Sequence, residues 1–496
     1  MKAFFLTSIL LLSSVLYGQD NYQLFYGNLH AHTWYSDGSG TPEDAYKMAQ
    51  NAGLDFFAVT PHNHIAAENS AKERKDGILI ATNHDLYNGT AALTFTRKYK
   101  EQGSDVYTST KIRNAKSVIS AAKSVTSSNF RAFYGQEFST ISSSNHINVF
   151  NYDSVITLKN GNIRALMELI HSSDKHDQIF LQLNHPNYRS DLLICDYDAP
   201  RTGKCKNCFN DYGIDTDDFG PFFNNWVKEL DPYTHLIEVL SGPAMKKTPI
   251  ANYHYKETGE DSYFFYLKQG LHISPSVGQD NHYETWGEMN DARIGIYARS
   301  LDMKDMLEAI KANRTFASED KNLAIDFTIN DTFMGSNINL ATDDALEIKV
   351  TVRDADEPNS KYTIELIHGH ISPEDSRNIH YVDVDSEVVD RRSDISAGTY
   401  LFNGFIATGK PEFYLLRCKQ EDDDRCWTAP IWINHPKQAE NQKMYYWTAS
   451  GSSKVYHIEG CKTIHAIKAE NLRSGSTPPE GRQQHHCISN GEYDED

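Results

Sequence analysis

Strands and helices are predicted to alternate over the first three hundred or so of the 496 residues, and this alternation constrains the fold more than any other feature. Apolar runs at residues 24–29 and 54–60 have the composition of buried strands. Between them, Thr41, Pro42 and Asp44 supply an N-cap, a first-turn proline and an acidic residue, which together predict the start of a helix. Such alternation favours a parallel α/β barrel or a doubly wound sheet.

The alternation of predicted strands and helices continues along the chain and is replaced after Lys321 by a pattern of strands alone. Further strands are predicted at 130–138, 146–152, 179–183, 235–240 and 272–277, with helices at 114–125, 163–171 and 301–312. Beyond residue 321, short alternating strands at 324–329, 346–352, 362–367, 413–418 and 431–433 lie between turn-rich segments. That second pattern is typical of an all-β sandwich.

The N-terminus has the pattern of a cleaved signal peptide. Lys2 is followed by an apolar run at 3–16 and a plausible cleavage region at 17–19, so residues 1–18 are expected to be removed and the protein to be secreted or periplasmic. The run is short for a membrane span, and no later segment is apolar for long enough, so stable membrane insertion is not expected. The formal charge of −19 argues against a nucleic-acid partner.

Seven cysteines suit an oxidising compartment. Cys418 and Cys426 flank an acidic loop and are expected to form a local disulfide, and Cys461 and Cys487 can pair near the C-terminus. The remaining three, Cys195, Cys205 and Cys208, leave one thiol over, and their connectivity stays open.

Histidines and carboxylates recur where successive predicted strands end. His30 and His32 follow the first strand, and residues i and i+2 of an extended chain point to one face, so both imidazoles can reach one ion. Asp37 follows closely, and His62 and His64 end the second strand. The later strands end in or near the remaining members of the set: Glu137, His146, His185, Asp280 and His282.

Taken singly, each of these motifs is more often a surface or strand feature than a metal ligand. Their order is harder to explain by chance, because an α/β barrel gathers its functional groups at the carboxyl ends of its strands. Nine such residues predict two or three divalent metal ions, and mixed imidazole and carboxylate ligands suit zinc, manganese or iron.

With these motifs in order, the sequence resembles the PHP (polymerase and histidinol phosphatase) family of metal-dependent hydrolases. The resemblance covers about residues 26–317 and implies a distorted (β/α)7 barrel, at 19–320, with a trinuclear site. It assigns as metal ligands His30, His32, Asp37, His62, Glu137, His146, His185, Asp280 and His282, with Glu137 as the bridging carboxylate. The family's second motif commonly reads Thr-Asp-His, and Pro61 replaces the acid here, which puts the orientation of His62 in question.

The remaining regions also resemble known modules. Residues 321–436 look like the immunoglobulin-like β-sandwich attached to secreted PHP hydrolases. Residues 437–496, which end in an acidic tail, look like a degenerate Ada-type zinc module. Val455-Tyr456-His457 and Cys461 match its first half, Cys487 matches its second half, and Asn490 stands where the last cysteine is expected. A Cys461–Cys487 disulfide is the favoured alternative to zinc there.

The expected activity is that of a secreted phosphoesterase, with a phosphodiester favoured, in which a metal-bound hydroxide attacks phosphorus. His64 is the candidate catalytic general acid, although a spare solvent-facing histidine is an equal interpretation. The expected substrate is a small-molecule, glycan-linked or lipid-linked phosphoester, with no obligate protein partner. Two alternatives stay open: hydrolysis of a carbamate, ester or amide by the same site, and a non-catalytic secreted protein that binds glycan or a cell surface.

Overall fold

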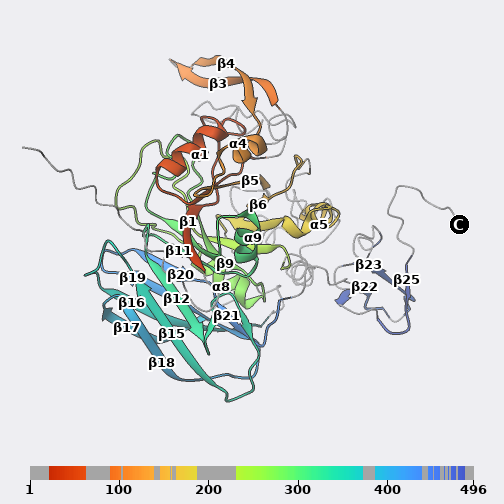
Figure 1. Cartoon of the computed structure of the whole chain (residues 1–496). Coiled ribbons are helices and arrows are strands. Elements are labelled where there is room, and N and C mark those ends of the chain that lie inside the picture. Colours follow the sequence, from red (N-terminus) through yellow and green to blue (C-terminus); the bar gives the residue numbers. More distant parts are fainter. Residues whose placement is uncertain are drawn as a thin grey trace, which may run out of the picture.

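The structure of the protein is a computed structural model of the whole chain (Figure 1). The residues that it describes are 22–62, 90–101, 104–138, 146–156, 158, 163–186, 231–372, 386–437, 445–450, 452–458, 463, 467–468, 471–475 and 479–485. The predicted signal peptide, His64, the acidic tail and every cysteine except Cys418 and Cys426 lie outside these residues.

The first strand–helix–strand unit forms as predicted. Strand β1 (Gln23–Asn28) pairs in parallel with β2 (Phe56–Val59), and helix α1 (Pro42–Asn51) lies between them in the chain. Thr41 caps the helix, because its hydroxyl accepts from the Asp44 amide at 3.2 Å while the Asp44 carboxylate accepts from the Thr41 amide at 3.3 Å. The capping box fixes where the helix starts, and therefore how the chain leaves the segment that carries His30 and His32.

The strands that carry the candidate site belong to one large curled sheet, in the order β10-β1-β2-β5-β6-β7-β8-β9 (Figure 1). Their bounds are β5 (Arg131–Phe138), β6 (His146–Phe150), β7 (Phe180–Asn184), β8 (Thr234–Ser241), β9 (Ser274–Gly278) and β10 (Arg293–Ala298). Five of these strands coincide with predicted ones, whereas β10 was not predicted.

The predicted distorted (β/α)7 barrel is confirmed only in part, as a mixed α/β curled sheet, in which β6 runs antiparallel to both β5 and β7. Only residues 139–145 connect β5 to β6, which is too short for the crossover that parallel neighbours require. Among the described residues β1 and β9 are not paired as strands; just beyond their ends, Ala31 and Asn281 form a single bridge, and the His32 amide donates to the Asn281 carbonyl. The sheet is therefore a curled half-barrel among the described residues.

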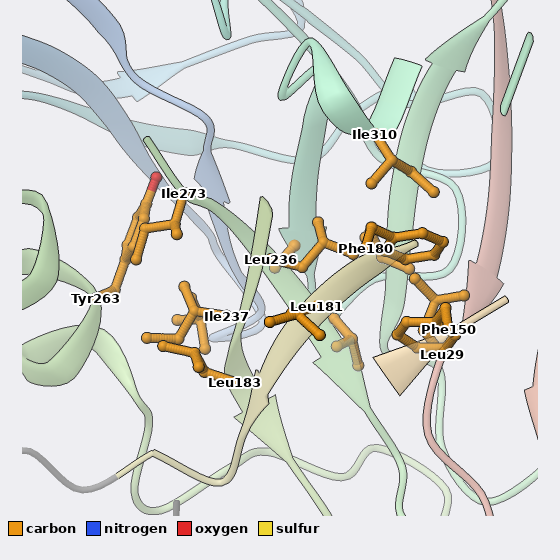
Figure 2. Packing of buried hydrophobic residues seen from close by; sticks show 14 of the residues in the cluster. Leu29, Phe150, Phe180, Leu181, Leu183, Leu236, Ile237, Tyr263, Ile273 and Ile310 are labelled. Carbon is orange, nitrogen blue, oxygen red and sulfur yellow. The ribbon is translucent and has the colours of Figure 1, made fainter. Parts of the chain in front are cut away.

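A large apolar cluster packs against the strands of this curled sheet. Figure 2 shows Leu29 beside Phe150 and Phe180 at one end and Ile237 beside Leu183 nearer the other, all fully buried. The aromatic rings of Phe150 and Phe180 stack with centroids 4.4 Å apart. Helices contribute to the same cluster through α5 (Ile163–His171), α8 (Glu260–Lys268) and α9 (Met303–Lys311). This packing holds the strands that bear the polar residues.

One segment differs from the predicted helix at 114–125. Residues up to Lys116 belong to strand β4 (Ser104–Lys116), which pairs with β3 (Thr90–Glu101) in a long hairpin, visible apart from the main sheet in Figure 1. Helix α4 (Val118–Val125) begins only after Ser117, whose hydroxyl accepts from the Ser120 amide at 3.1 Å. A side-chain cap thus stops the strand and starts the helix.

The region after residue 321 is all β, as predicted. A four-stranded sheet contains β12 (Ala324–Ile329), β13 (Thr332–Phe333), β15 (Ala345–Arg353) and β18 (Gly398–Ile406). Across a second apolar core lie β14 (Asn337–Ile338), β16 (Tyr362–His370), β17 (Ser386–Ile395), β19 (Glu412–Gln420), β20 (Arg425–Thr428) and β21 (Ile431–Ile433). These strands continue the large sheet, because β20 pairs with β11 (Thr315–Ser318) next to β10. The immunoglobulin-like assignment stays a prediction.

The predicted disulfide between Cys418 and Cys426 is wrong, since both are free thiols although they lie opposite each other on β19 and β20. Both side chains are fully buried in the second apolar core, where they pack as small hydrophobic groups. Burial raises the pKa of the Cys418 thiol to about 12, so it stays protonated and unreactive.

The C-terminal segment contributes a small separate sheet of β22 (Tyr445–Thr448), β23 (Val455–Ile458), β24 (Leu472–Gly475) and β25 (Gln483–Gln484). In it the rings of His457 and His485 lie with centroids 4.8 Å apart. The Ada-type zinc assignment stays a prediction, because Cys461 and Cys487 lie outside the described residues. Within the described part of the chain, no helix is both long and apolar enough to cross a membrane.

Candidate metal centre

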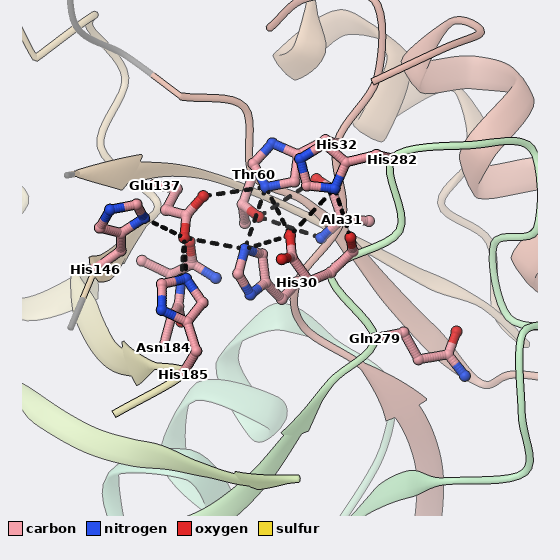
Figure 3. Close-up of polar contacts among 12 residues, drawn as sticks. His30, Ala31, His32, Thr60, Glu137, His146, Asn184, His185, Gln279 and His282 are labelled. Atoms are coloured by element: carbon pink, nitrogen blue, oxygen red, sulfur yellow. Dashed lines mark hydrogen bonds and ion pairs between the residues drawn. The ribbon is translucent and has the colours of Figure 1, made fainter. Parts of the chain in front are cut away.

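All nine residues predicted as metal ligands come together at one edge of the curled sheet. Figure 3 shows part of this cluster, including His30, His32, Glu137, His146, His185 and His282. The nine residues follow or end β1, β2, β5, β7 and β9, or begin β6. His146 reaches the same edge because β6 is antiparallel, so its first residue lies beside the last residues of its neighbours. The tenth predicted site residue, His64, lies outside the described residues.

The first group of potential ligand atoms surrounds His30 and His32, which are fully buried. Their Nε2 atoms lie 3.3 Å apart and both approach Asp280 Oδ1, at 3.3 and 3.0 Å. Glu137 Oε1 lies 3.2 Å from His30 Nε2, and Glu137 Oε2 lies 3.0 Å from His32 Nε2. Four ligand atoms arranged as a tetrahedron around a zinc ion, at its usual distances to nitrogen and oxygen, lie about 3.3 Å from one another. These atoms therefore fit one metal ion.

A second group gathers around Asp37, with His32, His62 and His282. Asp37 Oδ1 lies 3.3 Å from His282 Nε2 and 3.4 Å from His32 Nδ1, and Asp37 Oδ2 lies 3.6 Å from His62 Nε2. The ring of His32 stacks on that of His282 with centroids 4.2 Å apart. Asp37 is fully buried, so these imidazoles stand in place of solvent around its carboxylate.

The third group is centred on Glu137. Its Oε1 atom lies 3.0 Å from His146 Nδ1 and 3.1 Å from His185 Nε2, while Oε2 lies 3.1 Å from His62 Nδ1. Glu137 thus belongs to the first and third groups, and its two oxygens contact five imidazoles. A carboxylate in this position can bridge cations, which a single imidazole nitrogen cannot do.

The electrostatics favour positive ions. Burial alone would raise the pKa of the carboxyls of Asp37, Glu137 and Asp280, but the surrounding imidazoles outweigh burial and hold each pKa well below its usual range. Burial would lower the pKa of His32, yet the nearby carboxylates raise it to about 9. These three carboxylates therefore stay charged and attract cations, whether protons on the histidines or metals.

Backbone conformation at the site is also unusual. His185 and Asp280 have φ values of 29° and 51°, in the region that side chains rarely adopt. Hydrogen bonds hold both, since the His185 amide donates to Glu238 Oε2 at 2.7 Å and the Asp280 amide donates to the His30 carbonyl at 3.0 Å. Strain that the surroundings enforce is common at functional sites.

Sequence reasoning missed Glu238, a fully buried residue within β8. Its Oε1 lies 2.8 Å from His30 Nδ1, on the ring nitrogen that faces away from Asp280, and accepts from Gln182 Nε2 at 3.3 Å. A Cβ at position 278 would lie 1.6 Å from the same oxygen, so Gly278 leaves the space for it. A single carboxylate inside an apolar strand gives no spacing signal. Glu238 lies on β8 and Gly278 ends β9, so their contact can be found only when the two strands are placed side by side.

Trp34 and Tyr35, which follow His30 and His32 in the sequence and could have formed the wall of a pocket, pack against the apolar interior. Tyr35 is 2% exposed and belongs to the apolar cluster beneath α1, and Trp34 packs against that cluster. The Tyr35 hydroxyl donates to the Lys116 carbonyl at 2.5 Å. Trp286 donates from its indole to the His32 carbonyl at 3.1 Å, and so fixes the backbone between the two ligand histidines and Asp37.

Comparison with known families agrees with this geometry. A family model for the PHP domain matches residues 28–212, which include seven of the nine clustered residues, while Asp280 and His282 follow the matched range. Residues 28–212 therefore carry a PHP domain, as the motifs predicted. The family match and most of the cluster therefore fall in the same part of the chain, and the cluster could hold divalent metal ions.

Solved structures are similar only at a distance. A two-domain protein from Bacteroides vulgatus, described as containing a predicted PHP-like metal-dependent phosphoesterase, is 13% identical with a TM-score of 0.36, over 80% of this chain and 91% of that one. A protein from Bifidobacterium adolescentis, assigned by inference as a metal-dependent phosphoesterase, is 12% identical with a TM-score of 0.20, over 53% of this chain and 88% of that one. Neither similarity is close enough to carry an argument. A comparison with curated proteins finds no match.

Proposed function

We propose that the protein is a metal-dependent phosphoesterase and that its substrate is a phosphodiester. The observation that carries the proposal is the position of Glu137, whose carboxylate is shared between groups of ligand atoms that each fit one cation. Several cations held together in this way suit a reaction whose transition state spreads negative charge over several oxygens. Phosphoryl transfer is that reaction.

The ligands divide by their contacts. His30, His32 and Asp280 would hold one ion, together with Glu137. Asp37, His62 and His282 would hold a second ion, and His146 and His185 a third that also contacts Glu137. Divalent zinc, manganese or iron, when bound, would lower the pKa of a coordinated water and neutralise charge on substrate oxygens. The chain itself fixes the imidazoles, excludes water from the buried carboxylates and keeps those carboxylates ionised. His64 is proposed as the proton donor to the leaving group.

The preference for a diester rests on the expected extracellular location and on the long insertions at 65–129 and 190–226, which suit a sizeable substrate such as a glycan-linked or lipid-linked phosphoester. Export is part of the same proposal, and N-terminal sequencing of the extracellular protein tests it. A mature chain that starts near Gln19 is expected. A chain that retains Met1 outside the cell would remove the support that export gives to the diester.

The activity is tested with the full chain reconstituted separately with zinc, manganese or iron. Bis-p-nitrophenyl phosphate, p-nitrophenyl phosphate and a p-nitrophenyl carbamate compare the three bond classes, and Glu137→Gln serves as the site-specific control. Diester hydrolysis that exceeds monoester hydrolysis and disappears in the control is expected. Carbamate hydrolysis with the same sensitivity would make the protein a different metal-dependent hydrolase, and full metal content without turnover would favour a binding protein.

A further inference from the structure

A second cluster of metal-binding side chains lies in the C-terminal β region, on strands β16 and β19. His368 and His370 are two residues apart on β16, so they point to the same face, and the register places Glu412 of β19 directly opposite His370. One ligand atom from each of the three lies within 4.8 Å of the others. The arrangement shares no residue with the PHP cluster.

The carboxylate of this cluster is buried and has no permanent cation beside it. Glu412 has an exposed fraction of 0%, and in the described chain its only ion pair joins Oε2 to His368 Nε2 at 2.8 Å. Among the described residues neither a lysine nor an arginine pairs with Glu412, and a buried carboxylate is stabilised by a positive partner.

The surroundings orient two of the three ligands and leave the third adjustable. The Thr408 amide donates to Glu412 Oε1 at 2.9 Å, which directs Oε2 toward the histidines. The ring of His368 stacks on Tyr414 with centroids 4.6 Å apart. His370 is exposed and makes no hydrogen bond to another described residue, so its side chain can rotate to bring its nitrogen from its present position to the roughly 3.3 Å ligand spacing of a zinc site. Partners behind the ligands and an open outer side are typical of metal sites.

We propose that His368, His370 and Glu412 form a second divalent-metal site, separate from the PHP cluster, with water completing the coordination. Two imidazoles and one carboxylate favour zinc or another late first-row ion over magnesium or calcium. The site adjoins the contact between the β region and α8, because the next two amides, of Ile371 and Ser372, donate to the carbonyls of Pro411 and Lys268. A metal there holds the ends of β16 and β19 together and stabilises this junction.

The test compares zinc content and thermal unfolding of the untagged full chain with those of His370→Gln. His370 is exposed, so its replacement leaves folding intact, and the site is expected to lose one equivalent of zinc at equilibrium dialysis while hydrolytic activity is retained. His254→Gln is the matched control, because His254 is also an exposed histidine near a carboxylate, 3.1 Å from Asp424, but belongs to no ligand group in the described residues.

Zinc should also raise the unfolding temperature of the wild type more than that of His370→Gln, since a ligand stabilises the state that binds it. Equal zinc content and equal zinc-induced shifts in wild type and His370→Gln would overturn the proposal and leave a simple His368–Glu412 ion pair. The outcome is independent of the proposed phosphodiesterase activity, because the PHP ligands are unchanged in all three proteins.

Discussion

Replacing Glu238 by glutamine tests whether the residue that sequence reasoning missed controls the metal centre. Glu238 is fully buried and makes three hydrogen bonds. Its carboxylate lies 2.8 Å from His30 Nδ1, and it accepts from the His185 amide at 2.7 Å and from Gln182 Nε2 at 3.3 Å. With His30 Nε2 facing Asp280, Nδ1 carries the proton and donates it to Glu238. A carboxylate in this place fixes the ring and makes it a better ligand.

The structure allows the size of the effect to be worked out. Glu238 meets N–H groups on both of its oxygens, whereas glutamine offers one oxygen and one NH2 group, so one donor must face another donor. A buried donor left without an acceptor costs about 1–3 kcal/mol, which corresponds to roughly 5- to 150-fold in an equilibrium constant. Loss of a partner behind a metal-binding histidine costs about 10- to 100-fold in affinity or activity. Glu238→Gln should therefore weaken metal binding and turnover by about one to two orders of magnitude.

The assay is competition with a chelator, followed by kcat on the best substrate at saturating metal. Glu365→Gln is the matched control. Glu365 is also buried, at 8% exposure, and accepts hydrogen bonds from Arg391 and Arg417, but it lies on β16, away from the PHP cluster. Metal affinity of Glu238→Gln within twofold of wild type would refute the reasoning. An equal loss in Glu365→Gln would show that any buried charge matters and that the contact with His30 does not.

Three further results are expected. Glu137→Gln should lose turnover by orders of magnitude and lose occupancy of one metal while it stays folded, because cations held close together would repel with less compensation; metal analysis and kcat check this, and normal values would contradict the bridging role. The double variant His30→Ala/His32→Ala should lose at least one metal ion by elemental analysis, and wild-type content would exclude these histidines as ligands. Burial raises the pKa of the Asp55 carboxyl from 3.8 to about 6, so the folded state favours the protonated form and stability falls as the pH rises from about 4 to 6. Asp55→Asn should not show this loss, so its free energy of unfolding, measured with urea, should exceed that of the wild type by about 1 kcal/mol at pH 7 and equal it at pH 3. The same difference at both pH values would contradict the burial argument.

The sequence predicted which polar residues lie close together better than it predicted the sheet, and the reason is physical. Strands such as β2 and β7 are short apolar runs bounded by polar residues, and a histidine that follows each such run is a local signal. The direction of β6 depends on the length of a connection and on which neighbour it pairs with, and its composition is the same in either direction. The β3–β4 hairpin was not predicted, although Gly103 lies in the sequence between its two strands.

The departure from the family motif at Pro61 is explained by the backbone. The expected acid would have oriented His62 through its side chain, and its absence put that orientation in question. In the structure the Glu137 amide donates to the Pro61 carbonyl at 3.0 Å, and His62 forms a parallel bridge with Glu137 itself. The end of β2 is thus joined to β5 at the residue that bears the central carboxylate.

His62 is consequently oriented by the same residue with which it shares a cluster. Its Nδ1 lies 3.1 Å from Glu137 Oε2 and its Nε2 lies 3.6 Å from Asp37 Oδ2, so both ring nitrogens face carboxylates of the centre. Proline lacks an amide hydrogen but retains its carbonyl, which is the group that the bridge requires. A backbone hydrogen bond can therefore replace the missing acid, because the position of the imidazole depends on where its Cα is held and not only on what its ring contacts.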